Sequence, residues 1–461
     1  LPKLTAQRYR KPMLMTEPTG GLLEFMLPDS AGIQESEAER ENRKRSRRAE
    51  EPVEPLYRLE DAKTALDLRQ SVKYGEWVEP GPGVRVRYWN AGHILGSASI
   101  EVEVQDGGGK AVRILFSGDI GPDEKVFYLE PDAPAGFDYI VCESTYGGRE
   151  RKDDTLIERR EALRREIQEA LGRGGNLVIP AFAVERSQEL LHDIGVLIKE
   201  GSIDPQLVFL DSPLASRITG VYQEHAAMFE DTELSARELF ADKRFRIIES
   251  VEESKAINNV RGGAVIMSAS GMCDAGRIRH HLKHNLWRRE ATVLFVGYQA
   301  VGTLGRMLYD GEKRVKLFGE TIQVAAEIRM LKAISGHADQ AGLIRWLEAI
   351  SPRPARVFIT HGDEDVAVLF KELLEQKGYA TYVPYSGDVW SLSGNEQLET
   401  GSPALAKGKG KQKKKQVKAD AALSHAMERL ALLAAHSVGF SNRLKDKLAR
   451  QINDLARRWE E

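Results

Sequence analysis

The sequence has very little cysteine and no long apolar run. Cys142 and Cys273 are the only cysteines among 461 residues, which excludes a framework of disulfide bonds and is typical of the reducing cytoplasm. No apolar stretch approaches the ~18 residues that a membrane-spanning helix needs. The first residues also lack the charged and then apolar layout of a signal peptide. We therefore expect a cytoplasmic protein with no membrane segment.

The sequence also lacks a strong excess of charge of either sign. The net charge is −3, so any surface that binds a polyanion such as a nucleic acid must be local. Hydrophobic residues make up 42% of the chain and charged residues 29%, as in ordinary globular proteins. A chain of 461 residues has room for two or three domains, each with its own core.

Potential metal ligands stand in glycine-rich loops after predicted strands. His93 follows the strand-like run 84–89, and Asp119 follows the run 112–116. The alternating segment 99–104 and a glycine turn lie between them, which predicts a hairpin. The hairpin would bring an imidazole and a carboxylate to neighbouring strand ends, where they could share a metal ion. A single histidine or aspartate at such a position is more often a cap or a surface residue.

Two later histidines stand in similar loops and strengthen the metal hypothesis. His337 lies in the segment Ser-Gly-His-Ala-Asp, and His361 follows the strand-like run 357–360. Glu143 follows another such run, 139–142, and precedes a glycine turn. That last pattern is as typical of a plain turn as of the edge of a site.

Between these two groups of ligands, short apolar runs alternate with helical segments. A helix is expected to start near Thr155, which can cap it, and to end at the glycines 174–175. The apolar runs that follow are 177–180, 207–210, 264–267 and 292–296. This alternation predicts parallel strands with helical crossovers, that is, a doubly wound sheet inserted into the first domain.

The loop after each of these runs contains small residues followed by an arginine. Ligands bind open α/β sheets at the carboxyl ends of the strands. Small residues and helix N-termini favour anions there, and an arginine offers two donors to a phosphate. The loops therefore favour a phosphate-lined wall, although such loops are generally rich in glycine, serine and capping residues. The arginines are Arg186, Arg217, Arg277 and Arg306.

Other segments admit two interpretations. The highly charged segment 34–51 fits a solvated helix or loop better than an RNA contact. His280, His281 and His284 lie on one expected helix, and we favour surface or packing roles for them over zinc binding. The lysine-rich segment 401–418 is a flexible tether or an RNA contact. A helical stripe over 444–459 suggests docking or self-association.

Taken together, these motifs resemble the metallo-β-lactamase-fold ribonucleases that carry a β-CASP insertion. The resemblance covers residues 1–398, and its most specific segments occur in the order of the family: 91–96, 116–121, 143–147, 180–186, 211–216, 268–271, 335–339 and 360–364. It implies an αββα metallo-β-lactamase sandwich over 1–150 and 334–398, with an inserted, doubly wound parallel β-CASP domain over 151–333. Residues 399–461, the lysine-rich linker and a helical segment, lie outside the resemblance.

The resemblance also implies a reaction: zinc-dependent hydrolysis of single-stranded RNA by a two-metal mechanism. A homodimer is a separate expectation, and the residues leave the oligomeric state open. His93 would bind one zinc ion, His361 the other, and Asp119 would bridge the two. His337 would protonate the leaving oxygen, and Glu143 would orient His337. The residues expected to hold the phosphates of the substrate are Ser212, Ser268, Ser270, Gly271 and Arg277.

One motif of the family, H-x-H-x-D-H, is absent from the sequence. The motif normally precedes a segment like residues 1–4, so we expect a fragment that lacks the opening strands and most of the zinc ligands. Such a chain should bind metal poorly and be inactive, whereas the full-length protein would be a ribonuclease. The alternatives are a non-catalytic RNA-binding subunit and a β-CASP nuclease that acts on DNA.

Overall fold

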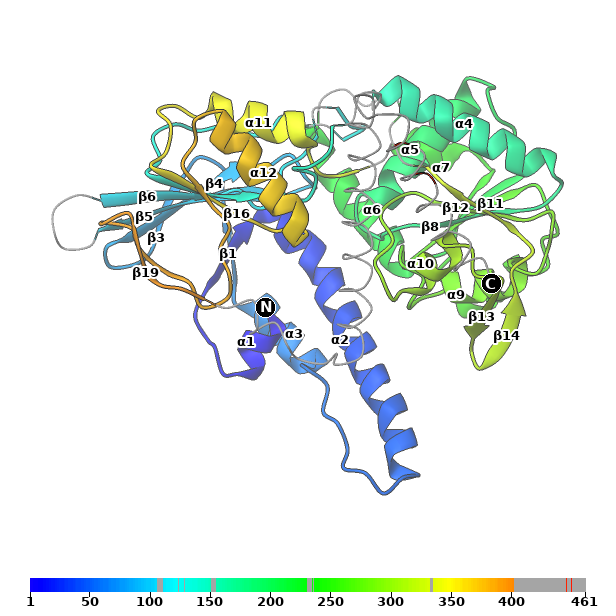
Figure 1. The fold of residues 1–461 in the computed structure, drawn as a ribbon. Coiled ribbons are helices and arrows are strands. Elements are labelled where there is room, and N and C mark those ends of the chain that lie inside the picture. The colour runs from blue at the N-terminus through cyan, green and yellow to red at the C-terminus, as the bar shows by residue number, and fades with distance from the viewer. Residues whose placement is uncertain are drawn as a thin grey trace. The chain divides into compact units, whose positions relative to one another are not determined.

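The computed structural model describes residues 1–105, 111–122, 124–127, 129–150, 155–229, 234, 236–331 and 335–401, together with residues 445 and 449 (Figure 1). The glycine turn at 107–109, the lysines of the segment 401–418 and the apolar residues of the stripe over 444–459 lie outside these ranges. Residues 1–384 and 392–395 belong to one compact unit. A second unit contains the antiparallel hairpin of β18 (Val389–Ser391) and β19 (Glu396–Glu399).

A seven-stranded mixed sheet is built from two distant parts of the sequence. Its strand order is β17-β16-β7-β6-β5-β4-β3. Neighbours from β3 to β6 pair antiparallel, and β6, β7, β16 and β17 pair parallel. The strands are β3 (Trp77–Gly81), β4 (Val84–Asn90), β5 (Ala98–Gln105), β6 (Ala111–Phe116), β7 (Tyr139–Glu143), β16 (Arg356–Thr360) and β17 (Thr381–Tyr382).

Two helices near the end of this unit complete the core of the mixed sheet. In Figure 1, α11 (Gln340–Ala349) and α12 (Glu364–Gln376) lie over one face of the sheet. Their apolar residues join strand residues in one buried cluster that includes Leu115, Ile140 and Phe370. Leu343 and Leu347 of α11 are spaced for one face of a helix, and both are buried in this cluster.

The segment before the mixed sheet contains α1 (Pro2–Ala6), β1 (Met13–Thr16), α2 (Glu17–Ser46), α3 (Leu59–Asp67) and β2 (Arg69–Val72). The first part of the highly charged segment belongs to α2, in agreement with a solvated helix. The local pattern of 59–70 favours one continuous helix, but α3 ends at Asp67, and Gln70 pairs with Leu14 between β2 and β1. Pairing with a distant strand therefore outweighs the local helical pattern.

A second sheet has six strands, all parallel, in the order β10-β9-β11-β8-β12-β15. Its strands are β8 (Leu177–Pro180), β9 (Leu207–Leu210), β10 (Phe245–Ile247), β11 (Ala264–Ser268), β12 (Thr292–Phe295) and β15 (Glu327–Met330). The helices around it are α4 (Leu156–Gly172), α5 (Arg186–Lys199), α6 (Pro213–Glu224), α7 (Ala236–Ala241), α8 (Val251–Ile257), α9 (Ile278–Asn285) and α10 (Leu304–Tyr309). A hairpin of β13 (Arg314–Leu317) and β14 (Glu320–Gln323) follows α10.

Burial on both faces explains why these strands read as continuous apolar runs. Leu177 and Ile179 of β8 belong to one buried cluster, and Val178 belongs to another. Alternate residues of a strand point to opposite faces, so helices cover both faces of this sheet. The predicted doubly wound sheet is thereby confirmed. The helix before β8 is also capped as predicted, because Thr155 accepts a hydrogen bond from the N–H of Glu158.

The chain leaves the mixed sheet after β7 and returns to it at α11 and β16, with the parallel sheet between. The domain bounds at 150, 333 and 398 remain predictions. Among the helices of the described ranges, none is both long enough and apolar enough to cross a membrane.

Candidate active site

A cluster of ionisable side chains lies where several strands of the mixed sheet end. Within the described ranges, one group of three could hold a metal ion: the ligand atoms of His93, Asp119 and His337 lie within 4.8 Å of one another. One carboxylate oxygen of Asp119 is 3.7 Å from Nε2 of His93, and the other is 3.0 Å from Nδ1 of His361. Asp119 therefore stands between two imidazoles, one on each oxygen.

Glycine permits the close approach of the two loops that carry His93 and Asp119. A β-bridge joins Gly92 to Ile120. A Cβ atom at Gly121 would collide with the carbonyl group of Gly92, so no larger residue fits there. Gly92 also has a φ of +67°, in the left-handed region that favours glycine. The glycine-flanked hairpin expected from the sequence thus brings the two side chains together.

The hydrogen bonds of His93 determine which of its nitrogens faces Asp119. Its Nδ1 lies 2.6 Å from the carbonyl oxygen of Gly336. A carbonyl oxygen only accepts, so Nδ1 carries the proton and Nε2 presents a lone pair to Asp119. Burial, together with the nearby His337, lowers the pKa of His93 to about 4, so the ring is neutral at neutral pH. A lone pair facing a carboxylate in this way is favourable when a cation lies between them.

His337 is paired with Glu143. Its Nδ1 donates to Glu143, with both carboxylate oxygens at 3.2 Å. The carboxylate also accepts a hydrogen bond from the N–H of Ile120 at 2.6 Å. Burial would raise the pKa of Glu143, but the hydrogen bond and charge of His337 outweigh it and hold that pKa below its usual range. Burial likewise opposes protonation of His337, yet the hydrogen bond and charge of Glu143 raise the pKa of His337.

His361 is the most accessible member of the cluster, with 57% of its side chain exposed. Its ring centroid lies 6.0 Å from that of His337, and the His337 centroid lies 4.4 Å from that of His93. The His337 ring therefore neighbours both of the other imidazoles of the cluster. Of the two later histidines, His337 belongs to the compact group of three, and His361 is in contact through Asp119.

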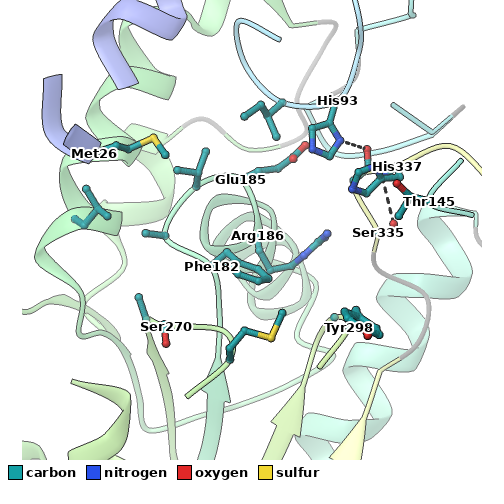
Figure 2. Close-up of a pocket in the computed structure, with 18 of the residues that line it drawn as sticks. Met26, His93, Thr145, Phe182, Glu185, Arg186, Ser270, Tyr298, Ser335 and His337 are labelled. Atoms are coloured by element: carbon teal, nitrogen blue, oxygen red, sulfur yellow. Dashed lines mark hydrogen bonds between the residues drawn. The ribbon is translucent and has the colours of Figure 1, made fainter. Parts of the chain in front are cut away.

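The cluster lies at one side of a cavity of about 1270 Å³ (Figure 2). The loops after β8, β9, β11 and β12 form much of the opposite lining, and α2 contributes Met26, Asp29 and Ile33. Figure 2 shows His93 and His337 on one side, with Phe182, Arg186, Ser270 and Tyr298 around the cavity. Loops at the carboxyl ends of both sheets thus line one cavity, as expected for a ligand site in α/β proteins.

The residues expected to hold phosphates divide into two groups. Ser212, Ser270 and Arg277 line the cavity, whereas Ser268 and Gly271 are not among its lining residues. Ser268 is buried, and its hydroxyl donates to the carbonyl oxygen of Asp211 at 2.7 Å. The Ser268 side chain therefore stabilises the loop after β9.

Arg277 lines the cavity, but its guanidinium group also has internal partners. It donates to Oδ1 of Asp211 at 2.7 Å and to the carbonyl oxygen of Glu249 at 2.8 Å. Oδ2 of Asp211 accepts from the hydroxyl of Ser254 at 2.6 Å and lies 2.6 Å from Nε2 of His281. His281 is buried beside Asp211, which agrees with the packing role expected for it.

Sequence reasoning missed a buried ion pair beside the cluster. The Nζ of Lys125 donates to the carbonyl oxygen of His93 at 2.5 Å and to Oε1 of Glu185 at 2.6 Å. Both side chains are buried, and burial raises the pKa of Glu185 against the pull of Lys125. Glu185 belongs to a segment that the resemblance singles out, but Lys125 carries no sequence signal. The pair ties the loop after β8 to the backbone of His93.

Two family descriptions match this chain. The Beta-Casp domain matches residues 187–308, and the Zn-dependent metallo-hydrolase RNA specificity domain matches residues 321–384. The first match lies within the segment that contributes most of the parallel sheet. The second includes α11, β16, His337 and His361.

Curated relatives extend the likeness over most of the chain. Ribonuclease TTHA0252 of Thermus thermophilus is 34% identical over 386 residues, which are 82% of this chain and 81% of that protein. Transcription termination factor FttA of Methanocaldococcus jannaschii is 30% identical over 84% of this chain and 60% of its own length. The FttA of Pyrococcus abyssi is 30% identical over 83% of this chain and 58% of its own length.

The mixed sheet carries the cluster of potential metal ligands, and the segment that forms the parallel sheet is inserted into its sequence. This arrangement defines a metallo-β-lactamase-type fold with a β-CASP insertion. The chain belongs to the β-CASP family of metallo-β-lactamase-fold ribonucleases. The family and the fold class expected from the sequence are thereby confirmed.

Proposed function

We propose that this protein is a zinc-dependent ribonuclease that hydrolyses phosphodiester bonds in single-stranded RNA by a two-metal mechanism. The observation that carries the proposal is the position of Asp119, with one oxygen toward His93 and the other toward His361. The ribonuclease named among the relatives supports this substrate. A cytoplasmic location and a homodimer are further parts of the proposal.

The donor set fits zinc. His93, Asp119 and His361 would hold the metal, because neutral imidazole and carboxylate are zinc ligands and the low pKa of His93 keeps its ring neutral. Glycine-supported loops and the Gly336 carbonyl orient His93 before any ligand binds. Zinc bound there would supply a Lewis acid that neutralises the charge developing on the phosphate.

His337 would act as the general acid. Its raised pKa, caused by Glu143, favours the protonated ring near neutral pH, and a protonated imidazole can donate but cannot bind a metal. Because Nδ1 donates to Glu143, the proton for the leaving 3′ oxygen of the RNA would come from Nε2. The competing assignment makes His337 a zinc ligand, since it belongs to the compact group of three, with Glu143 orienting it.

The opposite wall would hold the RNA backbone. The Ser212 hydroxyl lies at the N-terminus of α6, where it accepts from the N–H of Ala215, and Ser270 lines the same wall. A helix N-terminus and hydroxyl groups favour a phosphate. Arg277 lines the same cavity and would add a charged donor.

Cleavage of matched strands tests the proposal. Single-stranded RNA and DNA of the same sequence are incubated with zinc, with chelator and with zinc restored, using the active protein and its His337→Ala variant. We expect RNA cleavage that depends on zinc and is strongly reduced by His337→Ala. Preferential cleavage of DNA would favour the DNA nuclease, and RNA binding with no zinc-dependent cleavage by any form of the protein would favour a non-catalytic subunit.

The proposed ligand set also predicts the zinc content of the chain 1–461. With His93, Asp119 and His361 as its proposed ligands and no H-x-H-x-D-H motif in its sequence, we expect it to retain less than two zinc ions and to cut RNA little. Metal analysis of the purified chain measures this directly. Robust zinc-dependent cleavage by 1–461 would contradict the ligand assignment.

A further inference from the structure

Two large aromatic side chains are exposed inside the cavity, and the proposed chemistry gives them no role. Phe182 and Tyr298 line the cavity, and 46% and 58% of these residues are exposed. Figure 2 shows Ser270, Phe182 and Tyr298 in this order across the view. Aromatic side chains gain most from burial, so a cavity that exposes two of them is suited to a ligand with flat apolar faces.

The parallel sheet fixes the two rings on neighbouring loops. Phe182 follows β8, Tyr298 follows β12, and these two strands pair with each other through Leu177 and Thr292. Paired strands lie about 4.8 Å apart, so their ends hold the two loops side by side. Because the strands beneath are fully buried, the rings stand on a rigid base.

The ring of Phe182 is held with one face against the backbone of Gly271. A Cβ atom at Gly271 would be 3.2 Å from Cδ2 and from Cε2 of the ring and 3.3 Å from Cγ. Nearly equal distances to three consecutive ring atoms place that position over the face of the ring, because a point in the ring plane would be much closer to one of them. With one face covered, the exposed part of the ring includes the opposite face.

We propose that Phe182 and Tyr298 form a stacking platform for bases of the single-stranded RNA, one base on each ring. The inference rests on the proposed function, because it requires a strand in the cavity with its phosphates toward Ser212 and Ser270. Nearby apolar lining from Met26, Leu214 and Met272 suits the faces of the bases. Every base has a flat π-face, so the platform adds affinity without selecting a sequence.

The same geometry gives Gly271 a role other than the phosphate contact expected from the sequence. A side chain at this position would press on the Phe182 ring and tilt its exposed face. Gly271 is therefore a positioning residue for the platform. Gly271→Ala should weaken base stacking, although the chain still carries the Phe182 ring.

The platform is tested with the full chain 1–461 and single-stranded RNA that carries 2-aminopurine at one position at a time. Stacking on an aromatic ring quenches the fluorescence of this base. We expect quenching at defined positions, and its loss in Phe182→Ala or Tyr298→Ala with an affinity about 5- to 150-fold lower, the usual effect of removing a stacking ring. The salt dependence of binding should keep its slope, because stacking releases no counterions.

Conservative and distant variants separate stacking from stability. Phe182→Tyr and Tyr298→Phe keep a ring and should keep the quenching. Trp287 has a similar exposure, 54%, but does not line the cavity, so Trp287→Ala should bind RNA like the unmodified chain. Thermal melting of each variant identifies any that fails to fold. If an alanine variant does not fold, the quenching of Phe182→Tyr and Tyr298→Phe decides whether the rings stack on bases.

An abasic strand with the same phosphates separates a failure of the stacking platform from a failure of the proposed function. We expect it to bind more weakly than RNA to the unmodified chain. The abasic strand and RNA should bind about equally to a variant that lacks both rings, Phe182→Ala with Tyr298→Ala. If the unmodified chain binds RNA and the abasic strand equally well, the platform is overturned while the proposed function stands. If it binds neither strand, both are overturned.

Discussion

The charged groups are arranged differently in the loops of the mixed sheet and in the loops of the parallel sheet that line the cavity. After β4, β6, β7 and β16 of the mixed sheet, ionisable side chains face one another, and Asp119 stands between His93 and His361. After β9 and β11 of the parallel sheet, the carboxylate of Asp211 is paired internally with Arg277, Ser254 and His281. Lone pairs that converge, as in the loops of the mixed sheet, can bind a cation. In the loops of the parallel sheet the charge of Asp211 is neutralised by its partners, so hydroxyl groups and aromatic rings are the groups left to bind a ligand. Under the proposed function, the chemistry takes place at the edge of the mixed sheet, and the RNA is bound at the edge of the parallel sheet.

The sharpest test of this division compares His337 with His361 in a zinc-loaded, active form of the protein. His337→Ala should keep its zinc and lose about 10²- to 10⁴-fold in rate, the usual contribution of a general acid. His361→Ala should lower the zinc content, because it removes a proposed ligand. Metal analysis and single-turnover rates of both variants measure this.

A substrate whose leaving group needs no proton supplies the control. It should restore much of the rate of His337→Ala and none of the rate of His361→Ala. If His337→Ala loses zinc while His361→Ala keeps it, the two roles are reversed, and the compact group of His93, Asp119 and His337 is the metal site.

The next largest effect concerns the internal pairing of Asp211 and Arg277 in the loops of the parallel sheet. Asp211→Asn should lower the free energy of unfolding by about 3–5 kcal/mol, because it leaves the partly buried Arg277 without its counter-charge. Urea unfolding at pH 7 measures the loss. Asp310→Asn is the matched control, since Asp310 forms an exposed pair with Arg306, and it should change stability by less than about 1 kcal/mol.

The stability loss caused by Asp211→Asn should depend on pH. Burial would raise the pKa of Asp211, but its hydrogen bonds to His281, Ser254 and Arg277 outweigh it and lower that pKa. A lowered folded-state pKa means that the stabilisation is complete above the unfolded pKa of about 3.9 and is lost as the pH falls through the folded-state pKa. The stability difference between the unmodified chain and Asp211→Asn should therefore shrink only in acid. A difference that is the same at all pH values would show that the charge of Asp211 contributes nothing.

The smallest expected effect is that of Arg277 on RNA binding. Arg277→Ala should weaken binding modestly and reduce the slope of log Kd against log salt by about 1, because one phosphate contact releases about one counterion. Arg306→Ala, at an exposed pair that does not line the cavity, is the control and should leave the slope unchanged. An unchanged slope in Arg277→Ala as well would make Arg277 part of the scaffold alone.

The sequence predicted best those features that depend on local pattern. The bounds expected for β8 and β9 agree with the structure, because strands buried on both faces leave continuous apolar runs. His93 and Asp119 were expected to meet because a hairpin between them is a local feature. The local pattern does not show where α3 ends, because residues 69–72 form β2, which pairs with β1 far away in the sequence.

The missed parts of the site depend on tertiary contacts. Lys125 gives no signal in the sequence, since its partners His93 and Glu185 become neighbours only after both sheets have formed. Met26 reads as an ordinary apolar helix residue, and only the packing of α2 brings it to the cavity. Ser268 and Gly271 were expected to hold phosphates. In the structure the Ser268 hydroxyl bonds to the loop after β9, and Gly271 packs against the Phe182 ring.

The division of the mixed sheet between two parts of the chain has a consequence during synthesis. Cys142 of β7 and Thr360 of β16, which share a hydrogen bond, lie 218 residues apart. When β7 leaves the ribosome, β6 is available as a neighbour, but its other edge has no partner until β16 has been made. The parallel sheet contains strands close in sequence and can assemble during that interval. The newly made chain therefore carries an open strand edge, a surface prone to aggregation, throughout the synthesis of the insertion.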